Sequence, residues 1–196
     1  MVLPPHVSPR FRPAWRFQPH PLPRILVTGI FEAEVKNVPT ALQAVRCLRG
    51  LGMPCRVERW STFPLNPRET ELLQADAFHH LVPPRQVPEL LRQFDLLLFT
   101  SRAMEGFGLP VLEALRSGVP AVISTIPSLQ PFTAAGVASV DPEDSEGFAA
   151  AAYRLLDEAK AWRRARRVGR AAAAPFSEAA TQAALVAALK ALDGPA

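Results

Sequence analysis

The sequence predicts one α/β domain built on a doubly wound parallel sheet. Three observations support this prediction: short, continuously apolar segments recur along the chain, segments with helical periodicity separate them, and glycines stand at the junctions. The chain has 196 residues, of which 48% are apolar and 20% charged, and this fits one ordinary domain. We expect residues 1–23 to form a Pro-rich arm or linker and residues 24–196 to form the domain.

The expected elements alternate between strand and helix. The strands share short length and apolar continuity, and they cover residues 25–28, 55–60, 77–81, 95–100 and 121–123. The helices between them are bounded by Asn, Pro and Gly, and they cover residues 37–50, a stretch from 66, residues 88–94 and residues 109–117. Strands that alternate with helices in this way favour a parallel sheet with helices on both faces.

Local signals refine the helix ends. Asn66 and Pro67 start a helix with Glu69 at its third position, the arrangement of a capping box. From residue 145 onward the chain is Ala-rich and helical in pattern, and we expect these helices to be peripheral. Gly169 and the segment 175–177 are expected to interrupt them, with Ser177 capping the last helix.

A glycine-bearing loop at residues 101–108 carries the candidate chemistry. It follows the strand at 95–100, at the carboxyl end where doubly wound sheets bind ligands. Gly106 and Gly108 let backbone amides approach a ligand, and a helix starting at Leu109 aims free N–H groups at an anion such as pyrophosphate. An exposed helix end contributes about 0.3–1 kcal/mol, so other contacts must add to it.

Two carboxylates flank this helix start. Glu113 lies about one turn into the helix, where it can accept hydrogen bonds from two neighbouring ribose hydroxyls. Glu105, in the loop, can accept one from a sugar hydroxyl. The alternative is that both carboxylates favour the helix dipole and face solvent.

The segment Ser101–Pro120, SRAMEGFGLPVLEALRSGVP, resembles the region of family 4 glycosyltransferases in which two glutamates are separated by seven residues. Upstream, the likeness extends over residues 25–45, which match the family's first strand, glycine turn and lysine–asparagine loop. Downstream, it extends over three short segments, residues 126–129, 140–144 and 176–180. It covers almost all of the chain from Arg24 onward. The resemblance implies the Rossmann-like, C-terminal nucleotide-sugar-binding domain of a retaining glycosyltransferase with the GT-B fold.

The resemblance also implies roles for particular residues. Glu113 would hold the nucleotide ribose, Glu105 would contact the transferred sugar, and Lys36 would neutralise the leaving diphosphate. Contacts to the donor, a nucleotide-diphosphate sugar, are expected from Gly29, Gly106, Phe107, Gly108, Leu109 and Glu113. The implied reaction transfers the sugar with retention of configuration, and no cofactor or metal is expected because the sequence has no Asp-x-Asp pair.

Two departures from the family pattern bear on activity. Family members often carry Arg directly after the first-strand glycine, whereas this chain has Ile30. A GT-B enzyme also needs an N-terminal acceptor-binding domain, and the arm before Arg24 resembles only the interdomain linker. We therefore expect a truncated, split or degenerate donor half that is inactive without its missing partner domain. The alternative is a non-catalytic nucleotide-binding or protein-interaction domain on the same fold.

The remaining features concern partners and location. A net charge of +4 favours anionic partners. The arginine-rich run at residues 163–167 is interpreted as a solvated helix face, with a peripheral membrane surface as an alternative. Nucleic acid is not an expected partner, because no stacking aromatics are interleaved with this run, and a basic nucleic-acid-binding domain is kept as the weaker alternative. His79 and His80 lack partners at ligand spacing, and so no metal is assigned to them.

The cysteine count and the hydropathy indicate in which cellular compartment the protein is expected. Cys47 and Cys55 form no disulfide framework, which favours a reducing cytosol, and both are expected to be buried or half-buried. The sequence contains no apolar run of the roughly 18 residues that a membrane span needs. We expect a cytoplasmic protein, with the inner face of the membrane as an alternative site.

Overall fold

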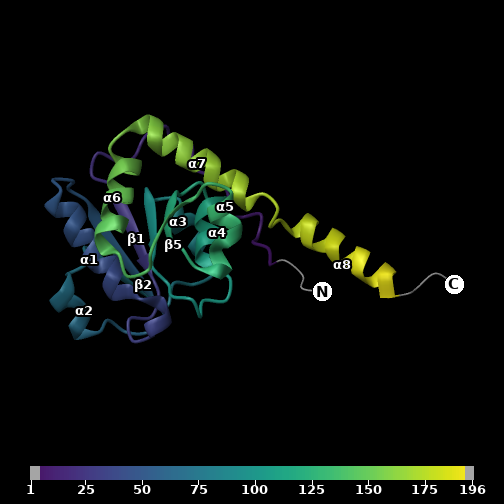
Figure 1. Cartoon of the computed structure of the whole chain (residues 1–196), viewed down its shortest axis with the longest axis horizontal. Helices are drawn as coiled ribbons and strands as arrows, with labels where there is room; N and C mark the ends of the chain where they lie inside the picture. Colours follow the sequence, from purple (N-terminus) through teal and green to yellow (C-terminus); the bar gives the residue numbers. More distant parts are fainter. Residues whose placement is uncertain (1–4, 193–196) are drawn as a thin grey trace.

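The computed structural model describes residues 5–192 and is centred on a six-stranded parallel sheet (Figure 1). The strands are β1 (Arg24–Thr28), β2 (Arg56–Ser61), β3 (Ala77–His80), β4 (Leu96–Phe99), β5 (Ala121–Ser124) and β6 (Ala138–Val140). Their order is β3-β2-β1-β4-β5-β6, and every neighbouring pair is parallel. The predicted doubly wound fold is confirmed, and its topological switch point lies between β1 and β4.

Within the described residues, eight helices and two 3-10 turns connect or follow the strands. They are η1 (Glu34–Lys36), α1 (Val38–Gly50), α2 (Pro67–Leu72), α3 (Val87–Leu91), α4 (Leu109–Arg116), η2 (Pro127–Leu129), α5 (Gln130–Ala134), α6 (Ser145–Leu156), α7 (Ala159–Ala173) and α8 (Glu178–Leu192). The five predicted strands agree with the structure to within one residue at each end. β6, α5 and the two 3-10 turns were not predicted.

The sheet separates two apolar layers. Side chains alternate along each strand, so that Ile25 and Val27 of β1 pack in the layer of α1 and α6, whereas Leu26 packs in the layer of α3, α4 and α5. Figure 1 shows α1 and α6 together on one side of the strands. Because both faces are covered, β4 is apolar throughout its length and β1 and β5 are largely apolar, which explains why the sequence revealed these three strands.

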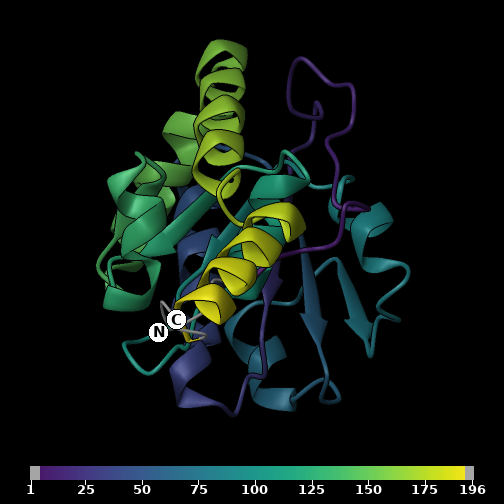
Figure 2. The ribbon, with the colours of Figure 1, turned by 90° about the vertical axis from the view of Figure 1, so that its right-hand side faces the viewer.

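The helices after residue 145 are not all peripheral, contrary to the prediction. α6 packs along α1 and buries Phe148 and Ala152, and Trp162 near the start of α7 is fully buried. These helices cover one face of the sheet and exclude water from it, and their small alanine side chains let them pack close to the neighbouring elements. α8 does extend away from the sheet (Figure 1) and points toward the viewer in Figure 2.

The expected helix break near Gly169 is also wrong. α7 runs through Gly169, and a Cβ there would lie 2.6 Å from Leu115 Cδ2, so this glycine serves close packing against α4. The break falls instead at residues 157–158. Ser177 caps α8 as predicted, because its Oγ accepts a hydrogen bond from the Ala180 N–H at 3.2 Å.

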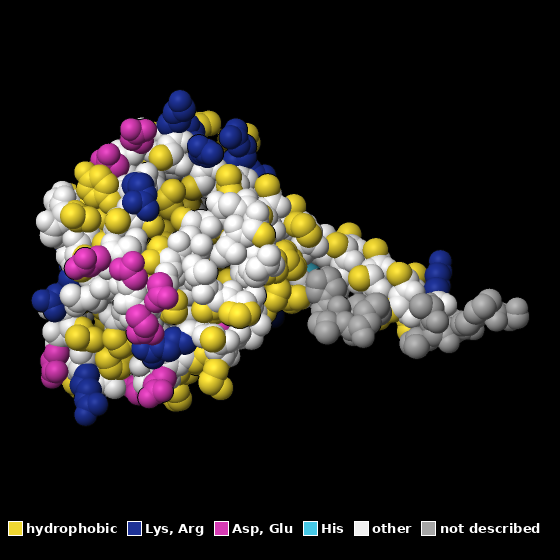
Figure 3. All heavy atoms as spheres, viewed as in Figure 1, with side chains coloured by type: hydrophobic (Ala, Val, Ile, Leu, Met, Phe, Trp, Pro, Cys, Tyr) yellow, Lys and Arg dark blue, Asp and Glu magenta, His cyan; other side chains and the backbone are white. Residues whose placement is uncertain are grey.

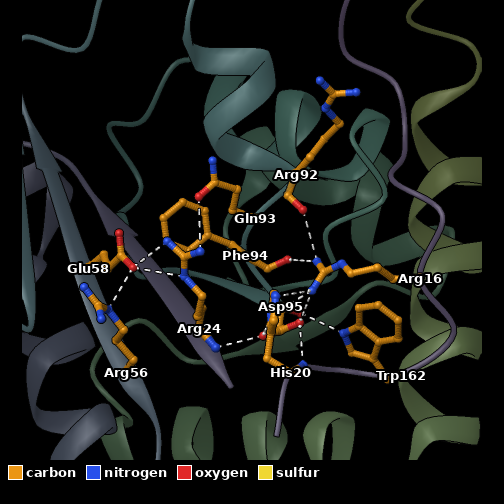
Figure 4. A network of polar contacts seen from close by, with 10 residues as sticks. All are labelled: Arg16, His20, Arg24, Arg56, Glu58, Arg92, Gln93, Phe94, Asp95 and Trp162. Atoms are coloured by element: carbon orange, nitrogen blue, oxygen red, sulfur yellow. Dashed lines mark hydrogen bonds and ion pairs between the residues drawn. The ribbon is translucent and has the colours of Figure 1, made fainter. Parts of the chain in front are cut away.

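The arm packs against the amino end of the sheet. Val7 and Phe11 are buried in the core, and the Arg16 guanidinium donates to the fully buried carboxylate of Asp95 at 2.7 Å (Figure 4). The Trp162 indole N–H donates to the Asp95 backbone carbonyl at 2.9 Å. Asp95 therefore joins the arm, the start of β4 and α7.

Candidate functional site

A cavity of about 300 Å³ lies at the carboxyl ends of β1, β2 and β4. This is the edge of the sheet at which the switch point between β1 and β4 opens a crevice. The lining is mostly apolar with a few polar groups: Leu26, Thr28, Gly29, Ile30, Lys36, Trp60, Ser61, Thr62, Val82, Val87, Leu91, Phe99, Pro110 and Glu113. Such a lining is typical of a small-molecule site.

The turn after β1 requires glycine at position 29. Gly29 has φ +129°, and its N–H donates to the Trp60 carbonyl at 3.0 Å. A Cβ at this position would lie 3.0 Å from Lys36 Cβ. The glycine therefore lets η1 fold back over the end of β1, and this brings Lys36 to the cavity.

A buried arginine supports this turn from below. Arg59 is 0% exposed, and its guanidinium donates to the carbonyls of Val27 at 2.8 Å and Gly29 at 2.9 Å. It also forms an ion pair with Glu69. Asn66 caps α2 as predicted, because its side chain accepts a hydrogen bond from the backbone N–H of Arg68. Glu69 does not complete a capping box, because its carboxylate is bonded to Arg59. The sequence prediction missed Arg59, since a charged residue in a strand usually faces solvent.

Lys36 and Glu105, the two predicted catalytic residues, lie in direct contact. Lys36 Nζ donates to Glu105 Oε2 at 2.7 Å, and Ser101 Oγ donates to the same oxygen at 3.0 Å. The backbone N–H of Arg102 donates to the Val35 carbonyl at 2.8 Å, which ties the loop after β4 to η1. Lys36 is the one cationic side chain among the described residues that line the cavity.

Glu113 faces the cavity from the second turn of α4. Its carboxylate has no hydrogen-bond or ion-pair partner within residues 5–192, and burial raises its pKa to about 7. A half-buried carboxylate without donors is costly in the ionised form. Donors supplied by a ligand would offset this cost.

Gly108 sets the start of α4. It is the N-cap residue with φ +76°, and a Cβ there would lie 2.6 Å from Leu129 Cδ2. The backbone N–H groups of Gly108 and Leu109 form no hydrogen bond within the described chain, as expected at a helix start. Both amides are therefore free to meet an anion.

The other predicted donor contacts do not line the cavity with their side chains. Phe107 packs edge-on against Phe132 and Phe176, with ring centroids 5.8 and 5.3 Å apart. Gly106 has open space where a Cβ would stand, and the Leu109 side chain is 47% exposed. These residues can contribute through the backbone alone.

The sequence prediction also missed the side of the cavity formed by β2. Trp60, Ser61 and Thr62 line it at the carboxyl end of that strand, and Val82 follows β3. Ligands bind at the carboxyl ends of strands next to the switch point, and this rule could have identified Trp60, Ser61 and the following Thr62.

The histidines have structural partners. His79 Nε2 lies 2.8 Å from a carboxylate oxygen of Glu58, and His80 Nε2 lies 3.2 Å from the Thr62 carbonyl. Within residues 5–192, no group of three or more His, Cys, Asp and Glu side chains is placed to hold a metal ion. No helix in the described part of the chain combines the length and apolar character needed to cross a membrane. Cys55 is buried and Cys47 half-buried, as predicted, and both are free thiols.

Comparisons with known proteins agree with this architecture. Residues 22–158 match the family model described as glycosyl transferases group 1. No curated protein matches the sequence. A solved C-terminal domain of a glycosyl transferase group 1 family protein (LpcC) from Francisella tularensis is 20% identical, with a TM-score of 0.66 over 83% of this chain and 93% of that chain.

Two longer structures share the same fold. Sucrose-phosphate synthase from Thermosynechococcus elongatus is 18% identical, with a TM-score of 0.79 over 98% of this chain and 52% of the synthase. TarM is 14% identical, with a TM-score of 0.77 over 94% of this chain and 37% of TarM. The chain therefore spans about half of the synthase and a smaller share of TarM.

Proposed function

Because the chain belongs to the group 1 glycosyl transferase family, we propose that it is the donor-binding part of an enzyme that transfers a sugar from a nucleotide diphosphate. One observation carries this proposal: Lys36 and Glu113 line a single cavity at the switch point, and Glu105 is bonded to Lys36. A cation, free helix amides and a carboxylate without donors match the phosphates and hydroxyls of such a donor.

Each part of the donor has a partner of matching chemistry. The ribose hydroxyls donate to Glu113, whose carboxylate lacks other donors within residues 5–192. The diphosphate accepts from the free N–H groups of Gly108 and Leu109 and from Lys36. An ammonium group has three N–H donors, so Lys36 can keep its bond to Glu105 while it donates to a phosphate oxygen.

The proposed chemistry is electrostatic. As the bond between the anomeric carbon and the diphosphate oxygen breaks, negative charge develops on the leaving diphosphate, and Lys36 and the start of α4 stabilise it. The acceptor oxygen forms the new bond to the anomeric carbon and transfers its proton to the oxygen of the leaving diphosphate. Glu105 holds Lys36 in place and accepts from a sugar hydroxyl. The resemblance to family 4 implies that configuration is retained and that no resident metal takes part. We propose both features for this chain.

We propose that the acceptor is bound by a separate domain that closes over this edge of the sheet. On the side of the α4 start, Pro110 lines the cavity, and the side chain of its neighbour Leu109 is 47% exposed. The donor sugar would extend from the diphosphate toward this side. On this basis the isolated chain binds the donor and does not transfer the sugar efficiently.

Calorimetry tests donor binding directly. We expect one of UDP, GDP and ADP, or one of their sugar derivatives, to bind the chain, and Glu113→Ala to weaken binding about tenfold or more, since a hydrogen bond to a charged group contributes about 1.5–3 kcal/mol. Glu71→Ala, which removes an exposed carboxylate on α2, is the matched control and should bind as the parent does. Equal affinities for the parent and Glu113→Ala would remove the ribose assignment.

The second candidate function is nucleotide binding without catalysis. It is favoured by Ile30, which lines the cavity where the family often has a basic residue, and by Arg59, whose guanidinium is occupied by backbone carbonyls and Glu69. Glu105→Gln separates the two candidates. If the chain is a donor domain, this change weakens the binding of a nucleotide sugar more than it weakens the binding of the matching nucleoside diphosphate. Equal weakening of both would favour the non-catalytic function.

A further inference from the structure

A second and larger hollow, of about 960 Å³, lies at the other end of the sheet from the donor cavity. The arm forms one side of it, and α7 together with the last residue of α4, Arg116, forms the other. α4 starts at the donor cavity and runs back toward the amino ends of the strands, so the two sites lie at opposite ends of this helix. We call this second hollow the basic groove, and its lining consists of Pro9, residues 11–17, Arg116, Arg163, Arg166, Arg167, Arg170, Ala171 and Ala174.

The basic groove carries an excess of positive charge, since Arg16 is the one arginine of its described lining that pairs with a carboxylate, that of Asp95. Among the described residues, seven arginines line it and no aspartate or glutamate does. Arg12, Arg116, Arg167 and Arg170 have no hydrogen-bond or ion-pair partner within residues 5–192, and Arg116 Nε is buried without one. Figure 3 shows dark-blue side chains along the edge that α7 forms. Guanidinium groups gathered in this way suit an anion rich in phosphate.

The like charges influence one another. Burial lowers the pKa of the Arg166 guanidinium, and the neighbouring charges of Arg16 and Arg170 lower it further. Arg163 donates a single hydrogen bond to a backbone carbonyl, at 3.0 Å, and keeps its remaining donors. Bringing these cations together is unfavourable in the absence of an anion, and a bound anion would relieve it.

The groove also presents two large aromatic side chains to solvent. Trp15 is 93% exposed and Phe17 is 69% exposed, and both line the groove beside the arginines. The backbone that carries them is fixed, because Arg166 donates to the carbonyls of Ala14, at 2.8 Å, and Arg16. Arg16 is itself held by Asp95 (Figure 4). The backbone that presents the two exposed rings is therefore fixed on the surface.

We propose that the basic groove is a docking surface for an anionic phospholipid membrane, with the arginines on the headgroup phosphates and with Trp15 and Phe17 in the interfacial layer. Arginines beside tryptophan and phenylalanine on one surface are the composition of proteins that lie on membranes. The docking surface is separate from the donor cavity, so a membrane-bound chain leaves the carboxyl edge of the sheet free.

A single-stranded nucleic acid is the competing partner. Its recognition uses several aromatic platforms along a groove that follows the backbone. The basic groove has two exposed aromatics, Trp15 and Phe17, and they lie two positions apart on the arm, across from the arginines of α7. Insertion of one edge into a membrane interface fits this arrangement better than stacking along a strand.

Flotation with vesicles tests the proposal on the full chain at about 0.15 M salt. We expect binding to phosphatidylcholine vesicles that contain phosphatidylglycerol and none to phosphatidylcholine alone. Arg167→Gln/Arg170→Gln should weaken binding about 25-fold, since each basic residue near an anionic membrane contributes about fivefold. Arg68→Gln/Arg85→Gln makes the same charge change at exposed positions away from the groove and should bind as the parent does.

Tryptophan emission gives an independent readout. Trp60 and Trp162 are 8% and 0% exposed, so a blue shift upon addition of anionic vesicles would report Trp15. Trp15→Ser changes no charge and should abolish the blue shift and weaken binding. Melting curves followed by circular dichroism verify that each variant is folded. No nucleotide enters these measurements, so they are independent of the donor proposal.

Three results would overturn the proposal. The first is the absence of binding to anionic vesicles. The second is an equal loss in the two arginine double variants, which would show general charge attraction in place of a docking surface. The third is tighter binding of a single-stranded RNA homopolymer that competes with vesicles and depends on Arg167 and Arg170, which would assign the groove to nucleic acid.

Discussion

Glu113 should make the unliganded domain less stable as the pH rises. Burial raises its pKa from the ordinary 4.5 to about 7 in the folded chain, whereas the unfolded chain titrates near the ordinary value. At low pH both states are protonated and the carboxyl group costs nothing. As the pH rises from about 4.5 to about 7, the unfolded state ionises first, so the free energy of unfolding decreases, and above pH 7 the full cost is present.

The size of this effect follows from the two pKa values. One pKa unit corresponds to about 1.4 kcal/mol, so the separation between 4.5 and about 7 amounts to roughly 3 kcal/mol at pH 8 and less than about 1 kcal/mol at pH 5. Glu113→Gln keeps the shape of the side chain and removes the charge. Its stability relative to the parent should therefore increase by about 2–3 kcal/mol between pH 5 and pH 8.

Thermal melting at the two pH values measures this difference. A change of 1 kcal/mol corresponds to about 2–4 °C in Tm for a chain of this size, so the gap between Glu113→Gln and the parent should widen by about 5–10 °C from pH 5 to pH 8. Glu71→Gln, at an exposed position on α2, should show no such widening. If the gap stayed constant, the carboxylate would be solvated and the reasoning from its burial would be wrong.

Three further predictions follow from the site. Lys36→Ala should weaken a nucleoside diphosphate at least about tenfold in calorimetry and leave the nucleoside unchanged, whereas equal losses would separate Lys36 from the phosphates. Gly108→Ala should destabilise the chain by about 1–3 kcal/mol in urea unfolding, because of its positive φ and the contact with Leu129, and Gly106→Ala, where a Cβ meets open space, should not. Arg59→Met should lower the free energy of unfolding by about 3–5 kcal/mol, because it leaves the Glu69 carboxylate unpaired. The double variant Arg59→Met/Glu69→Leu should recover part of this loss in the same urea unfolding experiment. Additive effects of the two changes would contradict the pairing.

The sequence revealed the features that depend on local pattern. A buried parallel strand is apolar on both faces, so β1, β4 and β5 were visible as continuous runs. Asn66 was identified as a cap because the capping interaction spans two residues of the same chain segment. Lys36 was predicted as a site residue from the resemblance to a family, and Glu113 from its place in the helix as well as from that resemblance. The structure places both on one cavity.

Features that depend on packing between distant segments were not predictable in the same way. Arg59 is paired with a carboxylate ten residues away and with the turn after β1, and no local pattern distinguishes such an arginine from an exposed one. Among the Ala-rich helices after residue 145, α7 has a polar composition and is nevertheless partly buried. It packs through Trp162 and through Gly169, whose lack of a side chain makes room for Leu115 of α4. The direct bond between Lys36 and Glu105 joins residues that lie 69 positions apart.

The ion pair between Lys36 and Glu105 has a consequence for the rate of donor capture. The 2.7 Å contact offsets the charge of the one cation that lines the cavity in the described chain, so Lys36 attracts a distant anion less strongly than an unpaired lysine would. A nucleotide sugar would then arrive by diffusion with little electrostatic steering, and its association rate should change little with ionic strength. Differences between nucleotides would appear in how long each one stays bound.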